Sequence, residues 1–317
     1  MRALCYERHG DPRDGVVKKV FDPRPGPGQL VVRVVAAALN PADWKIVEGK
    51  FPFLVFPKKP FVPGWEAAGV VDAMDSRVSG FRVGEEVLVS TGPSAGAVAE
   101  KLAVSALHVA KKPAGLSFEE AAAVPAAGQT ALQALRDAAG LRPGQRLLVN
   151  GAGGGVGTFA VQIGKILGAH VTAVASAAKL EALVHLGADA LVDYRKADFA
   201  KARDEWDVVF DVVPNRTFGE CSRVLAREGV YVTTLPGAGP FLASLGASIR
   251  APFGFRKRCR WVMLKPRGED LAQLVRWVEE GRLKPVVGKV VPLDQAAWAL
   301  SDLSAGHATG KTVVRVA

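Results

Sequence analysis

The spacing of hydrophobic and polar positions changes near residue 144 of this chain. Before that point the apolar runs are short and β-branched, like "LVVRVVAAAL" at 30–39, and turn-forming segments rich in Pro and Gly separate them. One longer helix is predicted over 117–135, with Ser117 as its N-cap and two acidic residues in its first turn. This part of the chain is therefore predicted to be a compact, largely β domain.

After residue 144, apolar runs alternate with segments that carry apolar residues at helical spacing. A strand-like run at 145–151 precedes a glycine-rich stretch and a predicted helix at 158–169, and a strand and a helix follow at 170–176 and 177–188. Further strands are predicted at 190–194, 206–213, 229–235 and 258–264. Strands that alternate with helices of about 10–12 residues indicate parallel strands with crossover helices, which form a doubly wound α/β sheet.

The C-terminal region after this sheet reads helix, strand, helix, strand. Its strands are expected to return to the first domain, which makes that domain discontinuous. We therefore predict a β domain formed by residues 1–124 and 266–317, and an α/β domain formed by residues 125–265.

The stretch "NGAGGGVG" at 150–157 lies between a predicted strand and a predicted helix. A strict G-x-G-x-x-G does not fit it, and the register that fits is A-x-G-x-x-G. Glycines permit a tight turn and close backbone approach, and the N-terminus of the following helix presents free N–H groups with a partial positive charge. We therefore expect this stretch to hold the pyrophosphate of a dinucleotide. The expected contacts are Ala152, Gly153, Gly154, Gly155, Val156 and Gly157, with Ala152, Gly154 and Gly157 in the key positions.

The end of the second predicted strand of the α/β domain indicates which dinucleotide is bound. Sites for NAD usually have Asp or Glu there to accept hydrogen bonds from the ribose 2′-hydroxyl, but this chain has Ser176, followed by Lys179. A hydroxyl and an ammonium favour a 2′-phosphate, whereas a carboxylate repels it. Tyr194 and Arg195 follow the third strand and are expected on the adenine side. Together these residues favour NADPH over NADH, although Lys179 alone would be interpreted as an ordinary surface lysine.

The chain of 317 residues has a formal net charge of +10 and a pI near 9.6. A basic surface attracts anions in general, including nucleotides, coenzyme A derivatives and nucleic acid. The densest cluster of Lys and Arg lies between Arg250 and Arg267, and we interpret it as a solvated loop and strand edge rather than a polyanion site. The charge permits binding of nucleic acid, but this is not expected.

The three cysteines, Cys5, Cys221 and Cys259, lie far apart and have no C-x-x-C spacing. This pattern supports neither a disulfide framework nor a cysteine-rich zinc site, and it fits a reducing compartment. No uncharged apolar run approaches the ~18–20 residues of a membrane span, and the N-terminus is too charged for a secretory signal. A cytoplasmic protein that is not inserted in a membrane is expected.

Several segments along the chain match one family in the right order. They are "PGPGQLVVRVVAAALNPADWKI", "FVPGWEAAGVV", "AAAVPAAGQTALQAL", "LLVNGAGGGVGTFAVQIGKILGA", "LGADALVDYR" and "GHATGKTVV". Together they resemble the medium-chain dehydrogenase/reductase superfamily, and most closely its zinc-independent quinone oxidoreductase branch, the ζ-crystallin-like enzymes. The resemblance implies a GroES-like β domain, a Rossmann domain that binds NADPH, and an active site in the cleft between these domains. By analogy it also implies a homodimer.

The same superfamily contains zinc-dependent alcohol dehydrogenases, in which a Cys and the His of a "GHE" segment bind the catalytic zinc. The resemblance places Asn40 and Trp65 at those two positions, and only Glu66 of the "GHE" segment is retained. Neither an amide nor an indole is a usual zinc ligand. Ala42 stands where those enzymes have the hydroxyl that relays the alcohol proton. The resemblance therefore implies a protein without zinc that does not oxidise alcohols with zinc assistance.

Without a Lewis acid, hydride addition to a conjugated system is favoured, because the developing charge is spread over several atoms and modest hydrogen-bond donors suffice. The resemblance thus implies hydride transfer from NADPH to a quinone or an α,β-unsaturated carbonyl (an enone), with Asn40 and Asp43 lining the substrate and nicotinamide site. Asn40 is expected to donate to the substrate oxygen. Asp43 either acts in this site or pairs structurally with a nearby Arg or Lys.

Lys45, Phe51 and Trp65 are expected to line the substrate pocket. Lys45 is either a proton donor or an exposed lysine, and Trp65 is either an apolar wall of the pocket or a buried structural residue. Phe51 is the nearest aromatic residue to the position where many relatives carry a Tyr, so the proton donor is not identified. On the cofactor side, the resemblance places Thr130 at the nicotinamide carboxamide or its ribose, with an ordinary helix-face threonine as the alternative. Leu235 is also expected to contact the cofactor.

Two other functions are compatible with the sequence. One is an enoyl-thioester reductase whose basic cluster meets the phosphates of coenzyme A or a carrier protein, although the lack of a Tyr or Thr donor near residue 51 argues against it. The other is a non-catalytic, NADPH-responsive protein that binds nucleic acid or another polyanion, which the charge of +10 permits.

Overall fold

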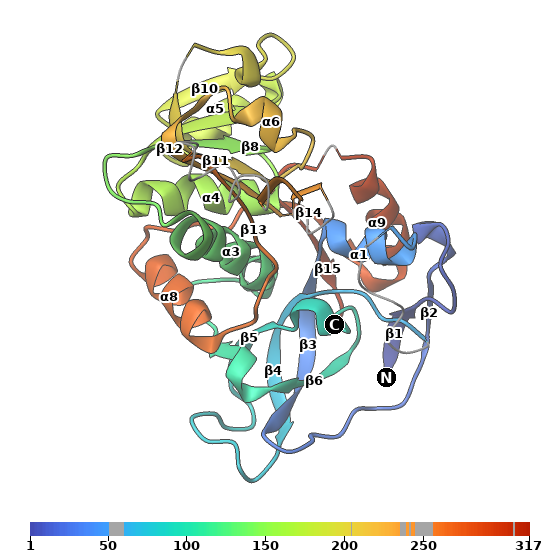
Figure 1. Cartoon of the computed structure of the whole chain (residues 1–317). Coiled ribbons are helices and arrows are strands. Elements are labelled where there is room, and N and C mark those ends of the chain that lie inside the picture. Colours follow the sequence, from blue (N-terminus) through green and yellow to red (C-terminus); the bar gives the residue numbers. More distant parts are fainter. Residues whose placement is uncertain (51–59, 204, 235–238, 241, 245–255, 307) are drawn as a thin grey trace. The chain divides into compact units, whose positions relative to one another are not determined.

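The computed structural model describes residues 1–50, 60–203, 205–234, 239–240, 242–244, 256–306 and 308–317 of the chain (Figure 1). The chain forms two compact units. The first unit comprises Met1–Gln129 and Lys265–Ala317, and the second unit comprises Thr130–Leu264. In the described part of the chain, no helix is long and apolar enough to cross a membrane.

The first unit is built on a largely antiparallel sheet. Among its described residues, seven strands pair in the order β14-β15-β3-β4-β5-β7, with β6 also paired to β3, and only β14 and β15 run parallel to each other. Because β15 pairs with β3, residues from opposite ends of the chain share one sheet (Figure 1). These strands are β3 (Gln29–Leu39), β4 (Glu66–Met74), β5 (Glu86–Ser90), β6 (Lys101–Ser105), β7 (Val109–Lys111), β14 (Val287–Pro292) and β15 (Lys311–Arg315). A separate antiparallel pair is formed by β1 (Arg2–Cys5) and β2 (Val16–Lys19).

Small side chains form the core between this sheet and a helix. The helices of the first unit are α1 (Pro41–Val47), α2 (Phe118–Ala122), α8 (Gly268–Glu279) and α9 (Ala296–Ser304), and α3 (Pro125–Leu132) starts in it. Ala36 and Ala38 of β3 and Ala68 of β4 are fully buried and share a core cluster with the alanines of α2. Since these residues carry only a methyl group, the helix backbone packs close to the sheet.

The helix predicted over 117–135 is wrong as a single helix. Its start is confirmed, because the Ser117 hydroxyl accepts a hydrogen bond from the Glu120 N–H and the Glu120 carboxylate accepts one from the Ser117 N–H. The helix α2 then ends, and α3 starts at Pro125, because a proline lacks an N–H and is accommodated at the first position of a helix. The π-helical segment Gln133–Ala139 follows α3 and ends at Gly140, which has a φ of 64°.

The second unit is built on a parallel sheet, which confirms the predicted doubly wound fold. Among its described residues six strands pair in the order β10-β9-β8-β11-β12-β13, and all these pairs are parallel. The first strand of the unit, β8, therefore lies inside the sheet, as in dinucleotide-binding sheets. The strands are β8 (Arg146–Asn150), β9 (His170–Ala175), β10 (Ala190–Asp193), β11 (Trp206–Asp211), β12 (Leu225–Thr233) and β13 (Arg258–Trp261). The helices are α4 (Gly155–Ile166), α5 (Ala177–His185) and α6 (Phe218–Cys221).

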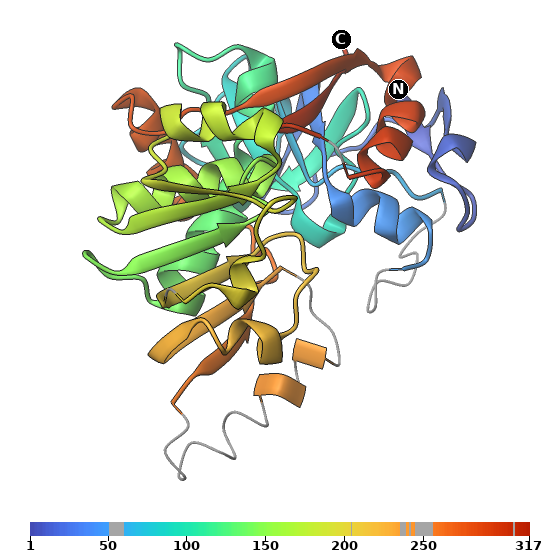
Figure 2. The same cartoon turned by 90° about the horizontal axis from the view of Figure 1, so that it is seen from above.

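The core of the second unit explains why its central strands are almost continuously apolar. Helices pack against the parallel sheet (Figure 2), so the strand β8 is buried at every position after Arg146. Phe159 of α4 and Phe210 of β11 are fully buried in this core. Cys221 and Cys259 are buried free thiols in the same unit, and Cys5 is a buried free thiol of the first unit.

Candidate functional site

The glycine stretch of the second unit forms the turn between β8 and α4. Gly151 has a φ of 82°, a conformation that favours glycine, and the N–H groups of Gly151 and Ala152 donate to the carbonyl oxygen of Val174 at 3.2 and 3.0 Å. Gly154 occupies the N-cap position of α4 and has no side chain to cap the helix. The N–H groups of the first turn of α4 have no partner within the helix, so this turn is suited to hold an anion.

Close contacts within the protein restrict two further positions of the turn, and at Gly157 the contacting atoms belong to the backbone. A Cβ at Gly157 would lie 2.2 Å from the carbonyl oxygen of Gly151 and 2.7 Å from the Cα of Ala152. A Cβ at Gly153 would lie 2.6 Å from the Cδ of Lys179. Among the described residues, the nearest atom to a Cβ at Gly154 would be the carbonyl oxygen of Gly151 at 3.6 Å, which is an ordinary contact distance.

The residues expected to select NADPH lie beside this turn. Ser176 follows β9 and occupies the N-cap position of α5, without a side-chain capping bond of its own. Lys179 lies in the first turn of α5, and its side chain passes over Gly153. Partial burial lowers the pKa of Lys179. A hydroxyl and an ammonium therefore lie beside the glycine turn, and the residue that directly follows β9 is a serine and not an Asp or Glu.

Tyr194 and Arg195 follow β10, the next strand of the sheet. The N–H of Tyr194 donates to the carbonyl oxygen of Ala175, which precedes Ser176. The Tyr194 side chain is exposed, and the Arg195 guanidinium lies 5.9 Å from the centre of its ring. The structure thus brings both residues to the edge of the sheet where Ser176 lies.

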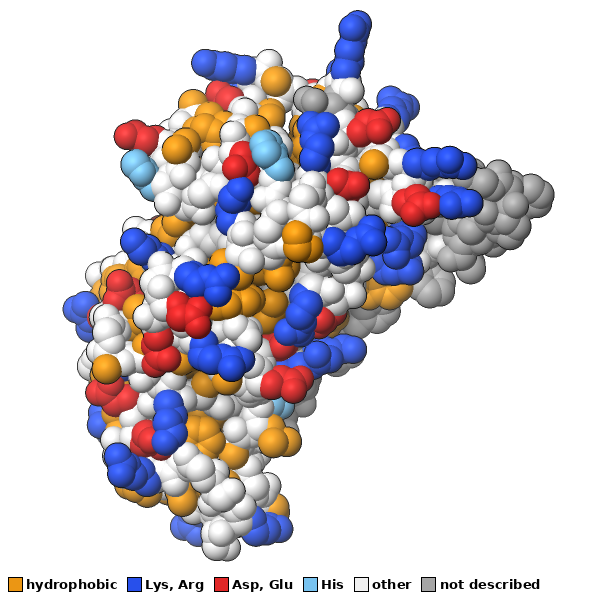
Figure 3. All heavy atoms as spheres, turned by 90° about the vertical axis from the view of Figure 1, so that its left-hand side faces the viewer, with side chains coloured by type: hydrophobic (Ala, Val, Ile, Leu, Met, Phe, Trp, Pro, Cys, Tyr) orange, Lys and Arg blue, Asp and Glu red, His pale blue; other side chains and the backbone are white. Residues whose placement is uncertain are grey.

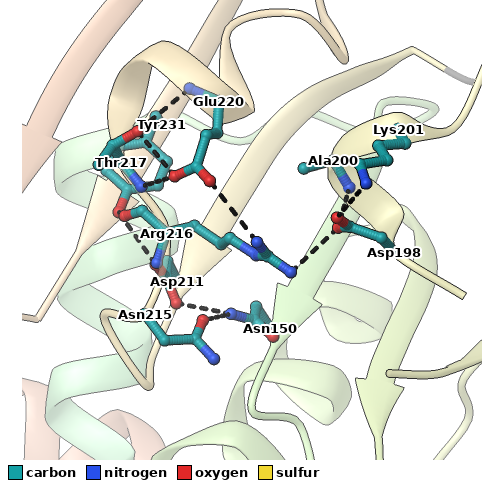
Figure 4. Close-up of polar contacts among 10 residues, drawn as sticks. All are labelled: Asn150, Asp198, Ala200, Lys201, Asp211, Asn215, Arg216, Thr217, Glu220 and Tyr231. Atoms are coloured by element: carbon teal, nitrogen blue, oxygen red, sulfur yellow. Dashed lines mark hydrogen bonds and ion pairs between the residues drawn. The ribbon is translucent and has the colours of Figure 1, made fainter. Parts of the chain in front are cut away.

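A buried polar network that the sequence did not reveal holds the loop after β11 (Figure 4). The Asn150 amide donates to Asp211 Oδ1 and to Asn215 Oδ1, both at 2.8 Å, and the Tyr231 hydroxyl lies 3.0 Å from Asp211 Oδ2. Asp211 is fully buried, and burial raises its pKa despite these hydrogen bonds. The signal in the sequence was the presence of a polar residue at the end of two apolar strands, Asn150 of β8 and Asp211 of β11.

The loop after β11 lies against the glycine turn. A Cβ at Gly151 would lie 2.1 Å from Cγ2 of Val213, and the N–H of Val212 donates to the carbonyl oxygen of Asn150. Further along this segment, the Arg216 guanidinium pairs with Asp198 at 3.1 Å and with Glu220 at 3.5 Å (Figure 4). The buried Asp211 network therefore holds the loop that packs against one side of the glycine turn, the turn suited to hold a dinucleotide.

In the first unit, Asp43 ties the end of β3 to the segment before β4. Asp43 is fully buried in α1, and its two carboxylate oxygens accept hydrogen bonds from the N–H groups of Asn40 and Gly64, each at 2.8 Å. Its partners in these bonds are backbone groups, not a Lys or Arg side chain. Burial raises the pKa of Asp43 to about 7, although the two N–H groups and the charge of Lys311 oppose this shift.

A second buried cluster contains Asn40, Glu66 and Lys311. The Lys311 ammonium donates to Asn40 Oδ1 at 2.6 Å and to the carbonyl oxygen of Leu39 at 2.9 Å, and it pairs with Glu66 Oε1 at 2.5 Å. The Asn40 amide nitrogen donates to the same Glu66 oxygen at 3.1 Å, and it lies 3.4 Å from the carbonyl oxygen of Ala38. Lys311 lies within "GHATGKTVV", but the sequence indicated no role for it.

The structure describes three of the five remaining residues that were predicted to line the substrate pocket or to contact the cofactor. Lys45 is half-buried on α1, where burial lowers its pKa and its ammonium lies 5.5 Å from the centre of the Trp44 ring, so it is not the exposed lysine of one interpretation. Trp65 is buried, and Thr130 is half-buried on α3. Phe51 and Leu235 lie outside the described residues.

The basic segment between Arg250 and Arg267 is in part neutralised. Arg256 pairs with Glu228 at 2.7 Å, and the Lys257 ammonium donates to the carbonyl oxygen of Ser222 at 2.6 Å. Arg250 lies outside the described residues. On the face drawn in Figure 3, Lys and Arg side chains are interspersed with Asp and Glu and do not gather in one patch. A grouping of three or more His, Cys, Asp or Glu residues suited to a metal is absent from the described part of the chain.

Comparisons with known proteins identify the family. A family model described as "Alcohol dehydrogenase GroES-like domain" matches residues 26–134, and one described as "Zinc-binding dehydrogenase" matches residues 186–314. The chain is 40% identical over 297 residues to the 2-methylene-furan-3-one reductase of Solanum lycopersicum, which covers 90% of this chain and 71% of that protein. It is 35% identical over 329 residues to the chloroplast envelope quinone oxidoreductase homolog of Arabidopsis thaliana, which covers 99% of this chain and 98% of that protein.

The chain belongs to the medium-chain dehydrogenase/reductase superfamily, in its quinone oxidoreductase branch. It is also 36% identical over 299 residues to the chloroplastic NADPH-dependent alkenal/one oxidoreductase of Arabidopsis thaliana, with 90% of this chain and 72% of that protein covered. The solved structure of the quinone oxidoreductase from Coxiella burnetii superposes with a TM-score of 0.89 at 28% identity, over 100% of this chain and 99% of that one. The superfamily that the sequence resembles is thus confirmed, and so is the predicted fold class, a GroES-like domain with a Rossmann-like parallel sheet. The protein is an oxidoreductase of a family that uses NAD(P)H.

Proposed function

We propose that this protein is a zinc-independent reductase that uses NADPH to reduce an enone or a quinone. The observation that carries this proposal is the environment of Asn40, which stands where zinc-dependent relatives have their first zinc ligand. A metal would bind the amide through its oxygen, but that oxygen accepts a hydrogen bond from the Lys311 ammonium at 2.6 Å. What the side chain offers to a substrate is therefore an N–H donor.

An N–H donor suits hydride addition to a conjugated carbonyl. Bound NADPH would supply the hydride to the β-carbon of the enone, and the electron pair of the double bond moves toward the carbonyl oxygen. A hydrogen bond from the Asn40 amide to that oxygen stabilises the negative charge that develops there, and a proton from solvent completes the reduction. With a quinone, the negative charge that develops on hydride addition is spread over both oxygens, so a hydrogen bond from the Asn40 amide to one of them also stabilises it.

The preference for NADPH rests on the side chains beside the glycine turn. The turn Ala152–Gly157 would hold the pyrophosphate, and Ser176 with Lys179 would hold the 2′-phosphate, because a cation lies where an NAD site has a carboxylate. Tyr194 and Arg195 would flank the adenine. Two relatives support the substrate class, since one is named an NADPH-dependent alkenal/one oxidoreductase and another a quinone oxidoreductase homolog.

The test is NADPH oxidation with three acceptors in parallel: a small quinone, a 2-alkenal or enone, and a 2-enoyl thioester of coenzyme A. We expect turnover with the quinone or the enone, and a higher kcat/KM with NADPH than with NADH. Turnover with the thioester alone would favour the alternative of an enoyl-thioester reductase. No turnover with any acceptor would contradict the proposal.

We also propose that the protein is a homodimer in the cytoplasm. The strand β13 lies at the edge of the parallel sheet of the second unit, and Trp261 at its end is 39% exposed. Sedimentation of the purified protein would test the dimer, and a monomer at micromolar concentration would contradict it.

A further inference from the structure

Lys311 is an unusual lysine, because its ammonium is buried and each of its contacts is an acceptor. The side chain is 3% exposed, and the ammonium binds the Leu39 carbonyl oxygen, Asn40 Oδ1 and Glu66 Oε1. An ammonium has three hydrogens, so these contacts use its full donor capacity. Burial of a lysine is costly unless it is paired, and here Glu66 supplies the opposite charge while two oxygens accept the remaining hydrogen bonds.

The chemistry of these contacts permits only one orientation of the Asn40 amide. An ammonium cannot accept a hydrogen bond, so the amide oxygen, not the nitrogen, must face Lys311. The Glu66 carboxylate can only accept, so the amide nitrogen must face Glu66, as the 3.1 Å contact requires. A flipped amide would set N–H against the ammonium and oxygen against the carboxylate. The positive charge of Lys311 at the amide oxygen and the negative charge of Glu66 at the amide nitrogen therefore fix the orientation of the Asn40 side chain.

In this orientation, one of the two Asn40 amide hydrogens makes only a long hydrogen bond. The first hydrogen is used in the bond to Glu66, and the second points toward the Ala38 carbonyl oxygen at the long distance of 3.4 Å. A bond of that length is readily exchanged for a shorter one to an incoming oxygen.

We propose that Lys311 is a positioning residue that fixes the Asn40 amide with its N–H presented to the substrate carbonyl oxygen. This rests on the proposed function in one respect, the role of Asn40 as the donor. Glu66 completes the arrangement, because it neutralises Lys311 and its second oxygen accepts a hydrogen bond from the Ala126 N–H at 2.6 Å. The same carboxylate thereby holds the first turn of α3, the helix that carries Thr130.

The test removes the ion pair as a unit, since Lys311→Met alone would leave the buried Glu66 carboxylate unpaired and destabilise the fold. In the double variant E66Q/K311M, we expect kcat with the accepted enone or quinone to fall about tenfold, while the Kd for NADPH changes less than about twofold. The matched control is K289M/D302N, which removes an exposed ion pair of 2.8 Å that involves β14, the neighbour of β15. This control should retain the activity of the parent protein.

The double variant is then compared in a second background, Asn40→Ala. This substitution alone should lower kcat roughly 100-fold, as expected for loss of a donor to a developing oxyanion. If Lys311 acts through Asn40, E66Q/K311M should lower kcat less than about twofold further in this background. A full additional tenfold loss would overturn the proposal, because Lys311 would then act by another route.

A measurement on the unsubstituted protein keeps the inference independent of activity and of the folding of variants. The chain contains three asparagines, Asn40, Asn150 and Asn215, so selective ¹⁵N labelling of Asn gives three pairs of side-chain amide signals. The Asn40 pair is assigned by its loss in N40A. We expect one Asn40 amide proton to be protected from exchange with water by Glu66, and the other to exchange faster. Rapid exchange of both protons would overturn the orientation, even if the enzyme reduces enones. Protection without turnover would instead contradict the proposed function alone.

Discussion

Substitution of Gly154 by Ala should separate binding of the dinucleotide from folding of the turn. Within the part of the chain that the structure describes, the nearest neighbour of the new Cβ would lie 3.6 Å away, and the backbone at Gly154, with φ −90° and ψ 177°, suits any residue. If a pyrophosphate lies over the turn, however, the added methyl group occupies the space next to it. The variant should therefore fold normally and bind NADPH poorly.

The magnitudes follow from the contacts. In G154A, the unfolded chain loses conformational freedom worth about 0.4–1 kcal/mol, and the poorer capping preference of Ala offsets this, so Tm should stay within about 2 °C. In G157A, the Cβ would lie 2.2 Å from the Gly151 carbonyl oxygen, far inside the ordinary contact distance of 3.4 Å. This oxygen belongs to the backbone, so it cannot move aside as a flexible side chain would. Overpacking of this kind costs about 3 kcal/mol, which lowers Tm by roughly 6–12 °C.

The assay is thermal unfolding of both variants, with NADPH affinity from quenching of tryptophan fluorescence. We expect G154A to keep its Tm and lose at least about tenfold in affinity, which is about 1.4 kcal/mol. Unchanged affinity in G154A would refute the placement of the pyrophosphate on this turn. An unchanged Tm in G157A would refute the close backbone approach between the turn and the first turn of α4.

Three further predictions concern the cofactor, the buried carboxylate and the metal. Lys179→Ala should raise the KM for NADPH with little effect on NADH, and equal effects on the two would exclude a role at the 2′-phosphate. Burial raises the pKa of Asp43 from 3.8 to about 7, so between these values the folded state binds more protons than the unfolded state and stability falls as the pH rises. Asp43→Asn should remove this part of the pH dependence in chemical denaturation from pH 5 to 8, and a wild-type pH profile in the variant would contradict the shift. Elemental analysis of the purified protein should find no stoichiometric zinc, and bound zinc would overturn the argument from Asn40 and Trp65.

The sequence predicted the features that depend on neighbouring residues. The alternation of strands and helices after residue 144 predicted the parallel sheet, since periodicity within one segment reports which faces are buried. The predicted strand at 170–176 and helix at 177–188 placed Ser176 and Lys179 after the carboxyl end of β9. In the sheet, β9 pairs with β8, the strand that leads into the glycine turn. The cap at Ser117 was likewise readable, because it depends on a residue only three positions away.

The sequence failed where one local signal opposed another. The helix expected over 117–135 is rich in alanine and has a clear N-cap, but α2 ends before Pro125 and α3 begins at it. Here the missing N–H of a single residue outweighed the propensity of its neighbours. The roles of Asn40 and Asp43 stay predictions that rest on the resemblance, although the structure shows how each side chain is held.

Contacts between distant residues were decided by the tertiary structure alone. Lys311 lies 271 positions from Asn40, and Asp211 lies 61 positions from Asn150, yet each pair is hydrogen-bonded in a buried cluster. Nothing in the pattern around these residues indicates the partner, because the pairing follows from β15 returning to β3 and from β11 lying beside β8. The sequence by itself thus determined the turn that suits a dinucleotide, through glycines and helical spacing. Only the tertiary structure decided what surrounds Asn40, because charges far apart in the chain meet only when the sheets assemble.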